Sequence, residues 1–162
     1  MRKNSRFVIL AVFFLMLGCS SISIRTDFDD QADFSTYKTY QWMDKKEKAG
    51  ARADLADTRI KRAIDQELGS KGYQLAGKGK NPDLLVIYHM NVTRKIQVDQ
   101  FDYRYWGPRR YKEGTLVLDF IDAASRQLVW RGWATGVLGR PQKMEEHINK
   151  AVQGLMEKYP PQ

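Results

Sequence analysis

The sequence predicts an α+β fold: a mainly antiparallel sheet with two amphipathic helices packed on one face, a two-layer sandwich. Several segments alternate apolar and polar residues with the period of two that a half-buried strand shows. Two longer segments repeat apolar residues at the period of about 3.6 that an amphipathic helix shows. The strands come in runs that only these two helices interrupt, which favours an antiparallel sheet over a parallel α/β fold.

The chain begins with the pattern of a secretory signal. Arg2, Lys3 and Arg6 make a positive start, and residues 7–17 are an unbroken apolar run of 11 residues. As a helix this run would rise only about 17 Å, which is short of the roughly 30 Å of hydrocarbon in a bilayer. We therefore expect residues 1–18 to be a signal peptide and not a membrane-spanning helix.

The only cysteine follows this signal directly. Residues 16–19, Met-Leu-Gly-Cys, resemble the lipobox of bacterial lipoproteins, although Met16 stands where that pattern usually has Leu. The resemblance implies that a peptidase cuts before Cys19 and that the sulfur is then acylated, with palmitate as a typical chain. Ser20 after the cysteine implies sorting to the periplasmic face of the outer membrane of a Gram-negative bacterium. The alternative is an ordinary signal peptide that leaves Cys19 as a free thiol.

Residues 19–162 then make the mature protein, a single α+β periplasmic domain that is lipidated at residue 19. Its 144 residues are enough for one domain that buries roughly 68–70% of the surface of its unfolded chain. The mature part has 24 basic and 19 acidic residues, a mild net charge of +5. With one cysteine no internal disulfide can form, so the fold depends on apolar packing.

The first elements are two strands and a helix. Alternation predicts strands at 22–24 and 37–42, with an acidic turn between them. From about residue 54 to 71 the period becomes helical, and we expect Asp54 or Asp57 to cap its start. Gly72 suits the left-handed conformation that ends a helix, which lets Tyr73 contact Leu68.

Three strands and a second helix follow. Apolar residues of one parity run from Leu84 to about Val98, which predicts a long or bent strand. Residues 116–120 and 128–133 alternate in the same way on either side of DAASRQ, which predicts a hairpin. Helical spacing returns over residues 143–159, where two prolines stop it.

These motifs, in this order, resemble a known family. The stretches DFDDQADFSTYKTYQW (27–42), KGY (71–73), NPDLLVIYH (81–89) and EGTLVLDFIDAASRQLVWRGWA (113–134) are similar to those of the bacterial lipoprotein family called domain of unknown function 4136. The resemblance covers nearly all of the mature chain. It implies an envelope lipoprotein of α+β build, with no established catalytic residues to carry over.

The sequence offers no pattern typical of a catalytic or metal site. Asp119 and Asp122 differ by three positions in a strand, so their side chains point to opposite faces and do not make a catalytic pair. The acidic cluster at 27–33 lacks the Gly and Glu positions of a calcium loop, and we interpret it as turn chemistry. His89 and His147 lack the spacing of a zinc site. We therefore predict no catalytic residue, no metal and no cofactor.

Residues 101–112, FDYRYWGPRRYK, are the one stretch with the composition of a binding site. Exposed rings offer stacking faces, and guanidinium groups offer paired donors to anionic sugars or phosphates. The rings also alternate along a strand, which favours packing on the sheet. The alternative is a ligand or partner surface made by these residues: Tyr103, Arg104, Tyr105, Trp106, Arg109, Arg110 and Tyr111.

Taken together, these features predict a non-catalytic, lipid-anchored protein of the cell envelope that binds or scaffolds other components. Its expected partners are the membrane, through the acyl chains, and an envelope protein, peptidoglycan or an anionic lipid headgroup. Nucleic acid is excluded because the signal sends the protein out of the cytoplasm. The alternative function is a small periplasmic hydrolase or transferase that acts on envelope glycans or lipids.

Overall fold

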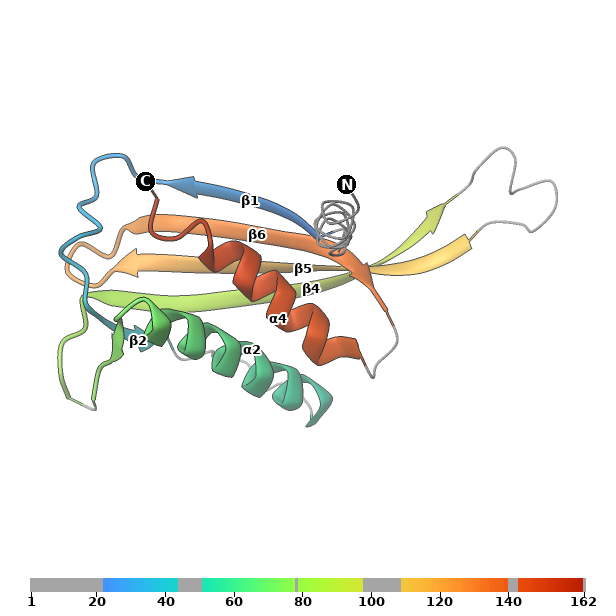
Figure 1. Cartoon of the computed structure of the whole chain (residues 1–162), viewed down its shortest axis with the longest axis horizontal. Helices are drawn as coiled ribbons and strands as arrows, with labels where there is room; N and C mark the ends of the chain where they lie inside the picture. The colour runs from blue at the N-terminus through green and yellow to red at the C-terminus, as the bar shows by residue number, and fades with distance from the viewer. Residues whose placement is uncertain (1–21, 44–50, 78, 98–108, 140–142, 162) are drawn as a thin grey trace, which may run out of the picture.

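The computed structural model describes residues 22–43, 51–77, 79–97, 109–139 and 143–161. These residues form one sheet of six strands with two helices on one of its faces (Figure 1), so the predicted α+β sandwich is confirmed. The elements, in chain order, are β1 (Ile22–Phe28), β2 (Thr39–Trp42), α2 (Ala51–Ser70), β3 (Gln74–Leu75), β4 (Leu84–Gln97), β5 (Arg109–Asp122), β6 (Leu128–Leu138) and α4 (Met144–Met156).

The strand order is β1-β6-β5-β4-β2-β3, and the sheet is mixed. The pairs β1·β6, β6·β5 and β5·β4 are antiparallel, as predicted. The short strand β2 pairs in parallel with both β3 and β4. Parallel pairing arises because α2 crosses over the sheet between β2 and β3 and returns the chain in the same direction.

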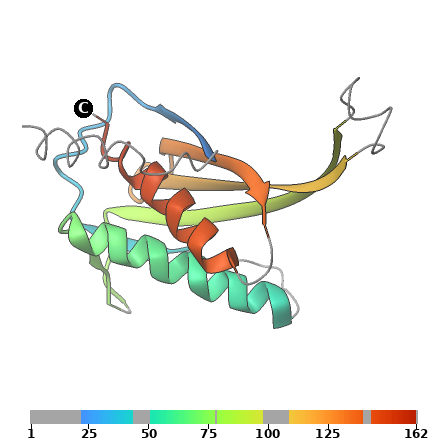
Figure 2. The same ribbon diagram turned by 45° about the vertical axis from the view of Figure 1, so that its right-hand side comes forward.

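The core lies between the sheet and the helices, which Figure 2 shows on the same side of the sheet. The even-numbered residues of β4 and β5 lie on the helix side of the sheet, and those in residues 84–88 and 116–120 are almost fully buried beneath the helices. Helix α4 packs on β6 and β1. The largest buried side chains of this core are Trp130, Tyr159, Phe120, Ile60, Ile64, Leu68, Leu84, Leu118, Leu155, Met156, Val86 and Val152.

Helix α2 begins earlier than the sequence predicts and ends as predicted. It starts at Ala51, so Asp54 and Asp57 lie inside the helix and the predicted cap is wrong. At the other end Gly72 has φ +87°, and the Tyr73 amide donates to the Leu68 carbonyl at 3.0 Å. The Gly72 amide donates to the Gly69 carbonyl at 3.0 Å. This pair of bonds is a Schellman ending.

The far end of α4 is closed by an aromatic cluster. Tyr159, which follows the helix, stacks on Phe120 with ring centroids 4.2 Å apart and meets Trp130 edge-on at 5.3 Å. The Phe34 ring packs against the Tyr159 ring, with the two centroids 6.0 Å apart. The C-terminal segment is thereby fixed over the start of β6, at the opposite end of β1 from Ile22 (Figure 1). Among the described helices, neither combines the length and the apolar composition that a bilayer crossing requires.

Candidate binding surface

The predicted binding stretch lies where β4 and β5 extend beyond the rest of the sheet. Of its seven predicted residues, Arg109, Arg110 and Tyr111 begin β5. Tyr103, Arg104, Tyr105 and Trp106 lie outside the described residues, so their role stays a prediction.

The two strands form a ribbon that has no third partner. The last residue of β6, Leu138, pairs with Lys112, and Lys112 pairs with Arg94. Beyond this row the pairs of β4 and β5 continue to Gln97 and Arg109 without another strand beside them. Figure 1 shows this ribbon leaving the helix-covered part of the sheet. We call residues 94–97 and 109–112 the basic ribbon.

The basic ribbon is rich in unpaired positive charge. Five of its eight residues are Lys or Arg and none is acidic. Lys95 has an ion pair with Glu113 at 3.6 Å, whereas Arg94, Arg110 and Lys112 are exposed and form no ion pair with any described residue. Guanidinium and ammonium groups that lack an internal partner are available to phosphate or carboxylate.

Exposed apolar side chains lie on the basic ribbon and on the part of β4 that leads to it. Ile96 is 62% exposed on the ribbon, and Val92 and Met90, further along the same face of β4, are 45% and 43% exposed. Tyr111 is half-buried and pairs with Lys95 across the ribbon. A surface that combines cations with exposed aliphatic side chains suits a partner that has both anionic and apolar parts.

A second polar cluster lies on the sheet face opposite the helices, and the sequence analysis missed it. Arg131 donates from Nε to Asp119 Oδ1 at 2.7 Å and from Nη2 to Oδ2 at 2.6 Å. The same guanidinium lies 5.8 Å from the Trp133 ring, and Asp119 is only 3% exposed. The predicted hairpin contained the signal, because its register places residue 119 directly opposite residue 131. This doubly bonded pair stabilises the hairpin.

Two further carboxylates, Asp122 before the hairpin turn and Asp65 in α2, are engaged in structural hydrogen bonds. Asp122 accepts from the Ser125 amide at 2.6 Å, and its face is opposite to that of Asp119, as predicted. Asp65 accepts from the Tyr40 hydroxyl at 2.6 Å and from Trp42 Nε1 at 3.0 Å. Burial, followed by this hydrogen bond, raises the pKa of Tyr40 well above its usual value, so the phenol stays a neutral donor.

The acidic cluster at 27–33 is confirmed as turn chemistry. Asp29 accepts from the Gln31 amide at 3.0 Å, and Asp33 accepts from the Ser35 amide and hydroxyl at 3.0 and 2.6 Å. The Ser35 hydroxyl, followed by its amide, holds the pKa of Asp33 below its ordinary value. No set of three His, Cys, Asp or Glu side chains in the described ranges is placed to hold a metal ion.

The comparisons with known proteins concern the family and the fold. A family model described as "Domain of unknown function (DUF4136)" matches residues 24–161. No curated protein matches the sequence.

Three of the solved structures that resemble this chain illustrate the range of the likeness. A PDZ domain protein from Parabacteroides distasonis has a TM-score of 0.61 at 15% identity over 87% of this chain, which spans only 36% of that protein. A homolog of neuraminyllactose-binding hemagglutinin from Helicobacter pylori has a TM-score of 0.50 at 12% identity, covering 81% of this chain and 87% of that one. The PelC dodecamer from Paraburkholderia phytofirmans has a TM-score of 0.48 at 14% identity, covering 83% and 98%. At these identities the likeness shows the fold alone.

Proposed function

The chain belongs to the DUF4136 family, and from this premise we propose that it is a lipid-anchored, non-catalytic protein of the cell envelope that binds an anionic envelope component through its basic ribbon. Its proposed location is the periplasmic face of the outer membrane. The observation that carries the proposal is that Ile22, three residues after Cys19 in the sequence, and the basic ribbon lie toward the same end of the sheet.

The strand register supports this placement. Cys19 precedes the first described residue, Ile22, by three positions. Ile22 pairs with Gly136 of β6, and Gly136 pairs with Gly114 of β5. Two residues from Gly114, at Lys112, the basic ribbon begins. A chain that is acylated at Cys19 therefore holds its unpaired cations close to the membrane to which it is attached.

The engagement of the carboxylates supports a non-catalytic role. A general acid or base must reach a substrate proton. The Asp119 carboxylate instead accepts hydrogen bonds from Arg131, and the Asp122 carboxylate accepts from Ser125. The Asp65 carboxylate accepts from Tyr40 and Trp42. Arg94, Arg110 and Lys112 of the basic ribbon offer the opposite chemistry, namely donors that have no acidic partner among the described residues. Binding of phosphate or carboxylate groups uses such donors directly.

Acylation is tested first. Cells that are fed radiolabelled palmitate should label the natural protein, and the Cys19→Ser variant should take up no label. Equal labelling of the two proteins, or no label on the natural protein, would refute the anchor.

Binding by the ribbon is tested on the lipidated protein in detergent, where the acyl chains do not themselves drive retention. The probes are peptidoglycan sacculi and beads that carry glycerol phosphate, the headgroup of an anionic lipid. The natural protein should be retained on one of these probes and released as salt rises. Changing Arg94, Arg110 and Lys112 to Glu should abolish retention.

A matched control separates the ribbon from the overall charge. Lys38, Lys71 and Lys158 are also exposed but lie away from the ribbon, at the ends of other elements. Changing these three to Glu alters the net charge by the same amount and should leave retention unchanged. Equal loss in both variants would show that the binding is non-specific and would contradict the proposal.

A further inference from the structure

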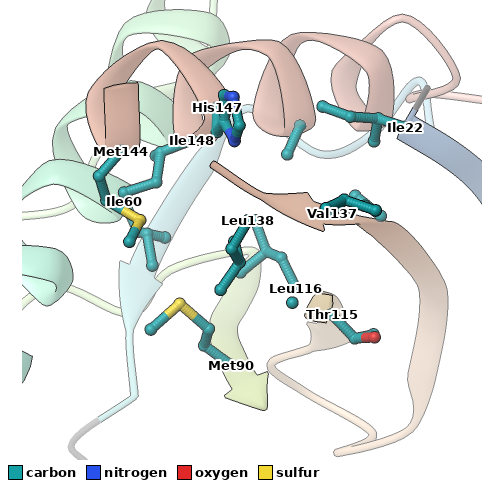
Figure 3. Close-up of a pocket in the computed structure, with 14 residues that line it drawn as sticks. Ile22, Ile60, Met90, Thr115, Leu116, Val137, Leu138, Met144, His147 and Ile148 are labelled. Atoms are coloured by element: carbon teal, nitrogen blue, oxygen red, sulfur yellow. The ribbon is translucent and has the colours of Figure 1, made fainter. Parts of the chain in front are cut away.

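An apolar cleft opens beneath the start of α4, at the end of the sheet where the basic ribbon begins. Figure 3 shows that its walls come from α4, α2 and four strands. The surface that lines it is apolar, and its volume is about 50 Å³, which makes it narrow. Residues that define its walls are Ile22, Met90, Leu116, Leu138, Met144 and Ile148.

The floor of the cleft is a part of the sheet where glycines let the Leu138 side chain lie against the backbone. Gly114 and Gly136 are direct neighbours in register and both are on the helix face. A Cβ atom at Gly114 would lie 2.8 Å from Leu138 Cδ2, so this wall already approaches the backbone closely. Ala134, one row further along, adds only a methyl group. The result is a hollow that large side chains surround but do not fill.

The chemistry of the walls selects the kind of ligand. Among the described residues that line the cleft, Thr115 and His147 have the only polar side chains, and the surface turned to the cleft is apolar. Apolar surface continues out of the mouth over Met90 and Val92, which are 43% and 45% exposed. A narrow apolar cleft of this volume fits the end of an unbranched hydrocarbon chain, and the exposed strip beside its mouth offers apolar surface to the carbons that stay outside.

The position of the cleft identifies the source of that chain. Ile22, one of its walls, comes three residues after Cys19. Three extended residues span at most about 11 Å, so an acyl chain attached to Cys19 begins within reach of the mouth. Because such a chain is tethered, its effective concentration at the cleft exceeds that of a free fatty acid by a wide margin.

We propose that the free end of one acyl chain attached to Cys19 lies in this cleft, between α4 and the glycine pair of the sheet. The proposal rests on the proposed lipidation of Cys19. The remaining chains stay in the bilayer, and the occupied cleft fixes the orientation of the domain, with the basic ribbon at the membrane surface.

The test uses the natural protein in intact cells that are fed a palmitate analogue with a diazirine near its free end. After irradiation, the protein should contain internal crosslinks from the acyl chain to peptides that include Met90, Leu138 or Met144. A labelled protein whose crosslinks go to phospholipid alone would overturn the proposal. A protein with no label would instead refute the lipidation on which the proposal rests.

Two variants of α4 and one at the anchor sharpen the result. Ala151 lines the cleft, so Ala151→Leu should keep the label and lose the internal crosslinks. Gln153, on the same helix, is exposed, so Gln153→Leu should keep both. If Cys19→Ser gave the same crosslinked peptides, the cleft would belong to free fatty acid or phospholipid chains, and the assignment to the anchor would be wrong.

Discussion

At the scale of single residues, a glycine in β6 determines how closely the helix layer approaches the sheet. Gly132 faces α4, and a Cβ atom there would lie 2.5 Å from a carbon of the Trp130 ring and 2.7 Å from Leu155 Cδ2. Both neighbours are fully buried. The helix can therefore approach this strand only because no side chain stands between them.

Gly132→Ala should lower the free energy of unfolding by about 1–3 kcal/mol, because the added methyl forces buried side chains out of place. Gly69→Ala is the control, since nothing lies within 4 Å of the methyl that it would add. Alanine in a helix is better than glycine by up to about 1 kcal/mol, so this variant should be slightly more stable. Urea unfolding measures both, and an equal response of the two variants would contradict the packing argument.

Asp83 joins β2 to the start of β4 through its charge. Its Oδ2 accepts from the Lys38 amide at 2.9 Å and from the Thr39 amide and hydroxyl at 2.8 Å each. The hydrogen bond from the Lys38 amide is the largest cause of a pKa below the ordinary value, with the two from Thr39 adding to it. A lowered pKa in the folded state means that folding favours the ionised form, so its contribution is present above the ordinary carboxyl pKa of about 3.9.

Asp83→Asn should therefore cost about 1 kcal/mol of unfolding free energy at pH 7, a modest value because the carboxylate is partly exposed. As pH falls below about 4 and through the lowered pKa, the natural protein loses the same contribution, and the difference should shrink. Urea unfolding at pH 7 and at pH 3 measures it. A difference that grows toward low pH would have the wrong sign for this argument.

At the scale of the elements, the Schellman ending of α2 positions β3 for its parallel pairing with β2. Gly72→Ala should lower stability by about 1 kcal/mol, because a side chain at φ +87° is strained. Asn tolerates this conformation better, so Gly72→Asn should lose less. Thermal unfolding of the two variants gives the order, and the reverse order would contradict the role assigned to the left-handed residue.

Much of this arrangement is predictable from the sequence because it depends on local patterns. The alternation of apolar and polar residues from Leu84 to Ile96 predicts β4, and the glycine at position 72 predicts the end of α2. The parallel pairing of β2 could not be predicted, because alternation shows which face a residue takes but not which strand lies beside it. The early start of α2 at Ala51 has no capping residue in its pattern to indicate it.

The candidate site is predictable only in part, for the same reason. Basic residues at 109–112 are visible in the sequence, but Arg94 and Lys95 join them only through the pairing of β4 with β5. The apolar cleft depends on Gly114 and Gly136 meeting across strands under α4. Contacts between segments that lie far apart in the chain have no periodic signature.

The basic ribbon can be removed as a test of whether it is a binding surface or part of the packing. In this variant, an Asn-Gly turn replaces residues 95–111. The turn joins Arg94 to Lys112, which are already paired in register. Stability should change by less than about 1 kcal/mol, because a two-stranded ribbon contributes little by itself. Retention on the anionic probe should weaken, because Lys95, Arg109 and Arg110 are removed and only Arg94 and Lys112 of the ribbon remain. A loss of several kcal/mol would instead support the alternative that this stretch packs on the sheet.

At the scale of the whole molecule, the two ends of the sandwich differ in chemistry. The ribbon end has cations without an acidic partner in the described part of the chain, exposed aliphatic side chains and the apolar cleft. The other end is closed by rings, with Tyr159 seated on Phe120 and Trp130. This polarity matches a domain that meets a charged, lipid-containing surface from one side only.

The fixed position of Tyr159 has a practical consequence for work on living cells. Strand β1 has seven residues, so its two ends are roughly 20 Å apart. In the proposed orientation, a fluorophore joined after the C-terminus would stand on the side of the domain that faces away from the membrane. A label at this position reports on the protein in the cell and leaves the basic ribbon and the apolar cleft unchanged.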